Sequence, residues 1–218
     1  MQKVISKNGA VVAANQTSLA ARLSFGAGAA SLLCLTTLHI LSPEFDPSWR
    51  MVSEYALGNY GGLLSLMFLA QALSCVALFF AVKSQIQTVG GRIGLFFLLA
   101  ASVGMAMASV FDVTHNLHGL AALIGIPGIA IAALIVGVSL SRKPIWSSTR
   151  RLLLWTANLP WISFVLMVTM LFIGLSRSGG EFGPDVLIGW PNRILIAAYS
   201  GWLMAVASQA VKLYGQKS

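Results

Sequence analysis

Six apolar segments, each near the roughly 20 residues that cross a bilayer, constrain the fold of this chain more than any other feature. Helices and closed barrels are the structures that satisfy backbone hydrogen bonding in lipid. Composition agrees, since 57% of the residues are hydrophobic and 9% are charged, against about 25% charged in a soluble domain. We therefore expect an all-α, polytopic membrane protein. Its six transmembrane helices are predicted over residues 19–41, 59–82, 92–111, 117–140, 152–175 and 191–213.

The distribution of charge predicts the orientation of these segments. Of the fourteen Lys and Arg residues, eleven fall on one side of the predicted spans and three, Arg50, Arg177 and Arg193, on the other. Cytoplasmic loops carry the excess of Lys and Arg, so we expect both termini in the cytoplasm and the spans in a bacterial inner membrane. The outer side then receives all acids and all histidines: Glu44, Asp46, Glu54, Asp112, Glu181, Asp185, His39, His115 and His118.

This orientation predicts a bundle of three helical hairpins. Each hairpin is closed by an outer connector, at residues 42–58, 112–116 and 176–190. Residues 1–18 are polar and weakly basic, which predicts a disordered cytoplasmic tail. Residues 19–213 then form one six-helix domain, and 214–218 form a short second tail.

The net charge of +8 does not indicate a nucleic-acid-binding protein. The basic residues are spread along connectors rather than gathered on a soluble domain, as expected for anchoring residues of a membrane protein. The expected partner of the chain is the lipid bilayer. Cys34 and Cys75 both fall within apolar runs, where cysteine acts as a small hydrophobe, and they are not expected to form a disulfide.

The segment DPSWRMVSEYALGNYG, residues 46–61, holds the most specific motif of the chain, Ser-Glu-Tyr-Ala at 53–56. Shorter motifs occur at Asp112, at His118-Gly119 and at Gly189-Trp-Pro-Asn-Arg193. In these residues the chain resembles the bacterial six-helix membrane proteins catalogued as domain-of-unknown-function family 998. The resemblance covers most of the chain and implies a membrane location and a six-helix fold. It implies no established reaction.

Glu54 and Arg193 are the charged residues whose positions need an explanation. Glu54 stands near the start of the second span, where a carboxylate is favourable to the helix dipole without any function. Arg193 stands in the first turn of the sixth span, where a cation opposes the dipole. Arg193 is therefore expected to pair with an acid of the same side, to await an anionic ligand such as a lipid phosphate, or to extend to the surface. The acids on that side include Glu54, Asp112, Glu181 and Asp185.

Asp112, His115 and His118 form the pattern Asp-x-x-His-x-x-His. His115 and His118 are three residues apart, which puts both on one helical face if the helix has started by that point. Divalent metals such as zinc accept histidine and carboxylate together, so these residues are a candidate metal site. The alternative is that they are ordinary polar residues at a membrane interface. A pair of stacked transmembrane haems is excluded because every histidine lies toward one side.

The sequence therefore predicts a polar site on the outer face. Glu54 and His118 are its candidate acid–base groups, and Tyr55, Asp112 and Arg193 its candidate ligand-binding groups. We expect it to bind or act on a lipid-like or small anionic ligand. The chain has no Gly-x-Ser-x-Gly nucleophile motif and no phosphate-binding Gly-rich loop.

Two other functions stay open at this level. A small-solute or proton-coupled transporter would place polar groups or broken helices near the bilayer centre, where this chain offers Gln71, Asn158 and Pro160. Gln71 and Asn158 are otherwise expected to form hydrogen bonds between helices. A non-catalytic accessory subunit would use helix faces rich in small residues to bind its partner.

Overall fold

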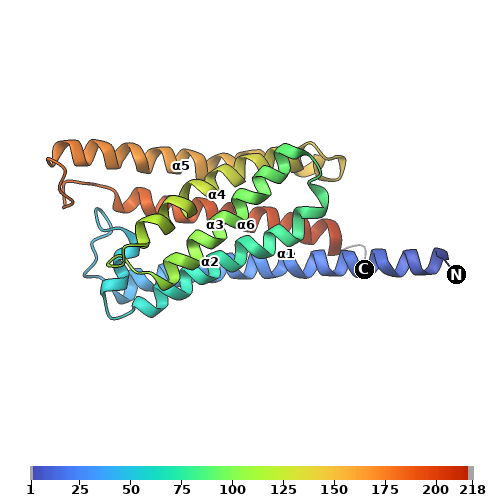
Figure 1. Ribbon diagram of the computed structural model, residues 1–218, viewed down its shortest axis with the longest axis horizontal. Helices are drawn as coiled ribbons and strands as arrows, with labels where there is room; N and C mark the ends of the chain where they lie inside the picture. The colour runs from blue at the N-terminus through green and yellow to red at the C-terminus, as the bar shows by residue number, and fades with distance from the viewer. Residues whose placement is uncertain (1, 216–218) are drawn as a thin grey trace.

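The computed structural model describes residues 2–215 and places them in α-helices, 3-10 helices and connecting segments, with no strand in that range (Figure 1). Each long helix contains a stretch apolar enough to cross a membrane. The expected all-helical fold with six candidate spans is confirmed. The long helices are α1 (Gln2–Leu41), α2 (Gly61–Val82), α3 (Val89–Val110), α4 (His118–Ser141), α5 (Arg150–Arg177) and α6 (Gly189–Gly215), and the short ones are η1 (Val52–Leu57), η2 (Lys83–Gln85) and η3 (Pro144–Thr149).

The helices extend beyond the apolar segments that predict them. α1 begins at Gln2, so helix occupies the segment for which we expected a disordered tail, although its membrane-length part starts at Ala14. No proline interrupts residues 2–41. α6 likewise continues to Gly215, and the rest of the expected second tail, 216–218, lies outside the described residues.

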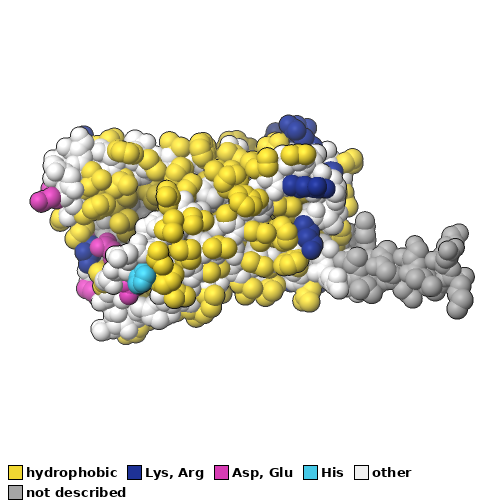
Figure 2. All heavy atoms as spheres, viewed as in Figure 1, with side chains coloured by type: hydrophobic (Ala, Val, Ile, Leu, Met, Phe, Trp, Pro, Cys, Tyr) yellow, Lys and Arg dark blue, Asp and Glu magenta, His cyan; other side chains and the backbone are white. Residues whose placement is uncertain are grey.

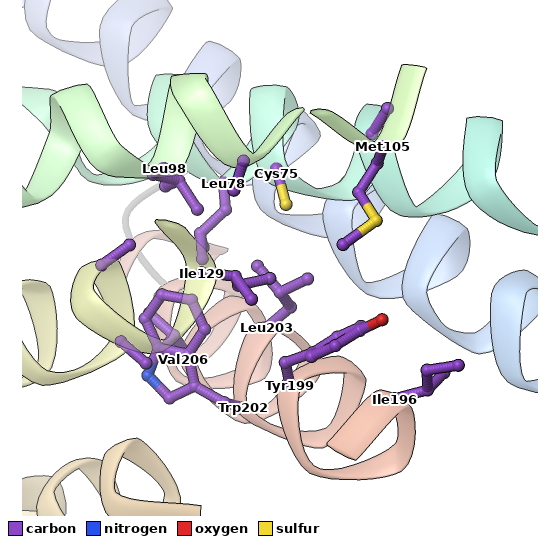
Figure 3. Packing of buried hydrophobic residues seen from close by; sticks show 14 of the residues in the cluster. Cys75, Leu78, Leu98, Met105, Ile129, Ile196, Tyr199, Trp202, Leu203 and Val206 are labelled. Atoms are coloured by element: carbon purple, nitrogen blue, oxygen red, sulfur yellow. The ribbon is translucent and has the colours of Figure 1, made fainter. Parts of the chain in front are cut away.

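Consecutive helices pack side by side, and the bundle closes because α6 returns to α1. α6 also contacts α2 and α4, which gives it the most interior position. Its inward residues Trp202, Leu203 and Val206 are fully buried, and Figure 3 shows them beside Ile129 of α4 and Leu78 of α2. These contacts form the middle of the apolar core.

Serine and glutamine hydrogen bonds tie α1, α2 and α6 together within this core. The Oε1 atom of Gln71 accepts from Ser31 Oγ at 2.8 Å and from Ser200 Oγ at 3.1 Å, so one amide joins three helices. The expected interhelical role of Gln71 is therefore confirmed. The same expectation is wrong for Asn158, which is exposed on the outside of α5 and donates to the Leu154 carbonyl of its own helix.

Close contact between α3 and α4 depends on two glycines. A Cβ added to Gly104 would lie 2.5 Å from the backbone nitrogen of Gly125 and 2.7 Å from the carbonyl oxygen of Ala121. Only hydrogen fits at that point, so the backbones of α3 and α4 touch directly. Small residues permit such approach between membrane helices.

The two ends of the bundle carry different charges (Figure 2). The segments 42–60, 111–117 and 178–188 lie together at one end and hold every acidic residue of the chain. We call this the acidic end; α1 begins and α6 ends at the opposite, basic end (Figure 1). The acidic residues that define the acidic end are Glu44, Asp46, Glu54, Asp112, Glu181 and Asp185.

Candidate functional site

The segment 42–60 folds over the acidic end because it docks on the first turn of α6. Gly189, the first residue of α6, donates its N–H to the Ser48 carbonyl at 3.0 Å. A Cβ on Gly189 would collide with the Pro47 carbonyl oxygen and would lie 2.9 Å from the Arg50 carbonyl oxygen. Glycine is therefore required here by close approach of two backbone segments.

Asn192 fixes η1 at the next point along α6. Its Oδ1 atom accepts from the Val52 backbone N–H at 2.9 Å, and its amide contacts the Met167 sulfur of α5 at 3.7 Å. Val52 opens η1, so this bond satisfies a donor that the 3-10 helix leaves unpaired. Both residues are buried, and η1 is thereby held as a lid across the bundle.

Arg193 forms the largest set of hydrogen bonds between the segment 42–60 and α6. Its Nη1 donates to the carbonyl oxygens of Arg50 at 2.6 Å and Gly189 at 3.0 Å, and its Nη2 donates to the Tyr55 hydroxyl at 3.0 Å. Its Nε donates to His39 Nε2 at 2.7 Å. The side chain is 4% exposed, and it joins α1, the segment 42–60 and α6.

The tautomer of His39 follows from these partners. A guanidinium can only donate and a carbonyl can only accept. His39 Nε2 therefore accepts from Arg193, and its Nδ1–H donates to the Leu35 carbonyl at 2.8 Å. His39 is a neutral imidazole that stabilises a buried cation, and it was not among the candidate site residues read from the sequence.

Pairing of Arg193 with an acid, one of the three alternatives, is absent from the described side chains of residues 14–214, where the one ion pair joins Arg50 to Glu54 at 3.0 Å. Neutral oxygens and a ring nitrogen accept from Arg193 instead. The guanidinium donates to the carbonyl oxygens of Arg50 and Gly189, and these contacts offset the unfavourable helix dipole. The charge of Arg193 does affect one carboxyl group, that of Asp46. The pKa of Asp46 is lowered chiefly by hydrogen bonds from Ser48 and in smaller part by the charge of Arg193.

Glu54 lies in the first turn of η1 and not in α2, which begins seven residues later at Gly61. Its Oε2 accepts from the Met51 N–H at 2.6 Å and its Oε1 pairs with Arg50. The Arg50 guanidinium also lies over the rings of Trp49 and Phe45, at 4.9 and 5.2 Å from their centroids. The structural role considered for Glu54, a carboxylate in the first turn of a helix, is therefore present, but in η1 and not in α2.

A cavity of about 420 Å³ opens below η1, between α2, α3, α4 and α6. Its walls are mostly apolar, and polar groups stand at its rim and along α6. In Figure 2 a hollow is visible on the side of the bundle near the acidic end, beside the magenta and cyan groups. The apolar walls include Phe68, Met105, Ala108, Ala122, Ile126, Phe182 and Ile196, and the polar groups are Ser53, Glu54, His118, Asn192 and Tyr199.

His118 stands at the rim of this cavity as the first residue of α4. Its Nδ1 bonds to the Phe111 carbonyl at 2.8 Å, and since a carbonyl only accepts, Nδ1 is the protonated nitrogen. Nε2 has no protein partner among the described residues. A histidine oriented through Nδ1 with a free Nε2 is suited to accept a proton or a hydrogen bond from a ligand.

Tyr199 brings a second free polar group into the cavity, deeper along α6. The residue is 2% exposed, and its hydroxyl forms no hydrogen bond within residues 2–215. Figure 3 shows the hydroxyl pointing into the space between Met105 and Ile196, which both line the cavity. A buried hydroxyl normally has a partner, so this one is available to a molecule in the cavity.

The candidate metal site does not assemble. α4 begins at His118, so Asp112 and His115 precede the helix and the three residues do not share a helical face. The Asp112 carboxylate accepts from the Thr114 N–H and hydroxyl at 2.8 and 2.6 Å, and His115 Nδ1 accepts from the Leu117 N–H. Within residues 2–215 no three His, Cys, Asp or Glu side chains are grouped to hold a metal ion.

The predicted site residues therefore divide into three groups. Glu54 and His118 line the same cavity. Tyr55 belongs to η1 and accepts from Arg193 of α6, so this pair holds η1 in place. Asp112 lines a separate recess of about 370 Å³ that also reaches His118. Asn192 and Tyr199 were missed, although Asn192 belongs to the Gly-Trp-Pro-Asn-Arg motif and is signalled by it.

These features define a class: a polytopic helical membrane protein whose first connector is locked onto the last helix, above an apolar cavity with a polar rim. The chain belongs to the family described as "Protein of unknown function (DUF998)", whose profile matches residues 25–209. Comparison with curated proteins and with solved structures gave no significant match.

Proposed function

We propose that this protein binds a lipid-like amphiphile in the cavity below η1. The observation that carries the proposal is the composition of the cavity, which has apolar walls and a polar rim formed by Glu54 and His118. Its volume of about 420 Å³ lies within the range of about 300–1,000 Å³ typical of small-molecule sites. The hydrocarbon chain of an amphiphile would contact the apolar walls, and its headgroup would contact the polar rim.

The location of the site on the outer face of a bacterial inner membrane is part of this proposal. The acids gather at one end, and most Lys and Arg residues lie toward the other. Under the positive-inside rule the basic end faces the cytoplasm. The three hairpins then close on the outer side, and the cavity stands at the depth of the outer leaflet.

Access from the bilayer is supported by the position of the cavity on the side of the bundle. Its lining includes Ala122 and Ile126 of α4 and Phe182 of the segment 178–188. Phe182 is 60% exposed, and the hollow in Figure 2 faces the side that lipid would cover. A chain could enter from the leaflet without crossing water.

Filling the cavity tests this proposal. Wild-type protein in phosphatidylcholine nanodiscs is irradiated with a C16 alcohol and, separately, a C16 fatty acid, each carrying a diazirine on the chain. We expect crosslinks to the cavity-lining parts of α3, α4 and α6, and their loss in Ala122→Phe. The matched control is Leu123→Phe, since Leu123 is 70% exposed on the same helix and does not line the cavity. Equal labelling of both variants and wild type would refute the proposal.

Proton transfer to or from the bound molecule is a second candidate function, favoured by the free Nε2 of His118. In an ester hydrolysis Nε2 would take a proton from the attacking water. It would return that proton to the alkoxide oxygen as the acyl–oxygen bond breaks. His118→Asn keeps a donor toward the Phe111 carbonyl and removes Nε2. If wild type hydrolyses a C16 monoacylglycerol, this variant should still bind it without turnover. Absence of hydrolysis by wild type would exclude this function for that substrate.

A transporter role gains no support from the polar groups nearest the centre of the bundle. Gln71 uses its oxygen to join α1 and α6, and Asn158 faces outward and bonds within α5. The Gln71 oxygen and the Asn158 amide thus have structural partners, and Gln71 Nε2 has none among the described residues.

A further inference from the structure

We infer that the cavity selects amphiphiles with an uncharged, hydroxyl-bearing headgroup and discriminates against anionic ones. This inference rests on the proposed function and specifies its ligand class. It departs from the anionic ligand that the sequence predicts. The evidence is the sign of the charge at the rim and the direction of its hydrogen-bonding groups.

The cations of the acidic end are held away from the cavity. Arg193 is buried behind η1, and four of its N–H groups already bond to His39, Tyr55 and the carbonyls of Arg50 and Gly189. It does not line the cavity. An anionic headgroup at the rim would therefore not reach the residue that the sequence offered as its partner.

Arg50 is also committed elsewhere. Its guanidinium pairs with Glu54 Oε1 and stacks against the rings of Phe45 and Trp49. Of these residues, Trp49 and Glu54 line the cavity but Arg50 does not. The one formally charged side chain of the lining is thus Glu54, a carboxylate, and it would repel an anion in a poorly solvated site.

The unused hydrogen-bonding capacity at the rim is that of acceptors: the remaining lone pairs of the Glu54 carboxylate and Nε2 of His118. An ionised carboxylate only accepts, and His118 with its proton on Nδ1 presents an accepting Nε2. A headgroup hydroxyl can donate to either. Along α6, the Tyr199 hydroxyl can donate or accept, so it would serve a second oxygen of the same molecule, such as a glycerol or sugar hydroxyl or an ester carbonyl.

A cationic headgroup is the competing solution to an acidic rim. Arg50 already pairs with Glu54 at 3.0 Å, so a cationic headgroup would have to lose its hydration and compete with Arg50 for the same carboxylate. A hydroxyl loses far less hydration than an ammonium. We therefore assign the preference to the uncharged alcohol.

Competition between ligands of equal chain length tests the inference. Wild-type protein in phosphatidylcholine nanodiscs at pH 8 is labelled with the diazirine C16 alcohol. Unlabelled hexadecanol, 1-monopalmitoylglycerol, palmitate, a C16 lysophosphatidylglycerol and hexadecylamine then compete for the cavity. We expect the two hydroxyl ligands to compete about tenfold better than either anion, and better than the amine.

Two variants test the role of the rim charge in opposite directions. Glu54→Gln keeps an oxygen for the Met51 N–H but removes the charge, and should reduce the discrimination against palmitate to about threefold or less. Arg50→Gln leaves Glu54 unpaired, and should increase it. Glu181→Gln is the matched control, because Glu181 is exposed at the same end and does not line the cavity. Melting curves of each variant confirm folding.

The possible results separate this inference from the proposed function. If no C16 ligand labels the cavity, or if Ala122→Phe has no effect, the proposed function is wrong. If ligands bind there but an anion or the amine competes as well as the alcohols, only the selectivity is overturned. Unchanged discrimination in both Glu54→Gln and Arg50→Gln would remove Glu54 as its cause.

Discussion

Arg193 donates its Nε–H to Nε2 of His39 across 2.7 Å, joining two residues that are 154 positions apart in the chain. The contact links the end of α1 to the first turns of α6. It also explains how a buried cation persists at this site without a carboxylate partner. A neutral imidazole, a phenol and two carbonyls share the charge.

Removing Arg193 should destabilise the protein. Arg193→Ala leaves the buried Tyr55 hydroxyl and the Arg50 carbonyl without their donor, so we expect a loss of about 2–4 kcal/mol in unfolding free energy. Arg193→Lys should recover little of it, because an ammonium lacks the planar fork that reaches these acceptors. The measurement is unfolding in mild detergent. Arg177→Ala, an exposed arginine at the same end, should change stability by less than about 0.5 kcal/mol; equal effects of the two alanine variants would contradict this role of Arg193.

The His39–Arg193 bond should appear as coupling between the two positions. His39→Phe keeps a ring but removes the acceptor, leaving a buried Nε–H unpaired at a cost of about 1–3 kcal/mol. In the Arg193→Ala background the same change should cost clearly less, since the donor is gone. Detergent unfolding of the four proteins gives the coupling energy. Additive losses would mean that the ring packs without the hydrogen bond.

Substitution of two glycines of α6 should have opposite effects. Gly189→Ala forces the segment 47–50 away from the helix, because its Cβ collides with the Pro47 carbonyl, and should destabilise by about 1–3 kcal/mol. Gly201→Ala meets no atom within 4 Å and should stabilise by about 0.5–1 kcal/mol. Thermal melting compares them. A stable Gly189→Ala protein would show that the segment does not dock as described.

The carboxyl of Asp112 should titrate below its ordinary pKa of 3.8, chiefly because of the hydrogen bonds from the Thr114 hydroxyl and N–H. The folded state then binds this proton more weakly than an unfolded chain. Its stabilising effect on the segment 111–117 is present above pH 3.8 and is lost as pH falls through the lowered pKa. Thr114→Val should raise the pKa toward its ordinary value while leaving Asp46 unchanged. Carboxyl carbon NMR with Asp-selective labelling measures both; an unaltered Asp112 pKa would refute the assignment.

The fold was predictable because the length of each apolar segment can be read directly from the sequence. Each of the six spans appears as an apolar run long enough to cross a bilayer. The ends of the helices were less predictable, because the helices continue beyond the apolar runs. Gln71 was correctly expected to join helices, whereas Asn158 was not recognised as outward-facing. The direction in which a polar side chain points depends on helix rotation, which a weakly amphipathic membrane helix does not reveal.

The site was predictable in composition but not in arrangement. Glu54 and His118 could be placed at one end by charge sorting alone. The partners of Arg193 could not be predicted. They include backbone carbonyls, which every residue has and which no sequence motif identifies, and a histidine from a helix distant in sequence. The helical face supposed for the histidines of the metal hypothesis is absent, because α4 starts at His118 and not before Asp112.

α4 is held in the cavity wall by packing, through its direct backbone contact with α3 at Gly104 and Gly125. α1, α2 and α6 share the Gln71 bonds, and α3 is tied to α2 through Ser102 and the Ala72 carbonyl. In the described chain, the body of α4 beyond His118 forms no side-chain hydrogen bond to another helix, and Pro127 interrupts its own backbone ladder. The glycine and alanine residues of α4 contact α3 without directional bonds. The fit of glycine against glycine is therefore what holds this wall in place, and a side chain at Gly104 would separate α3 from α4.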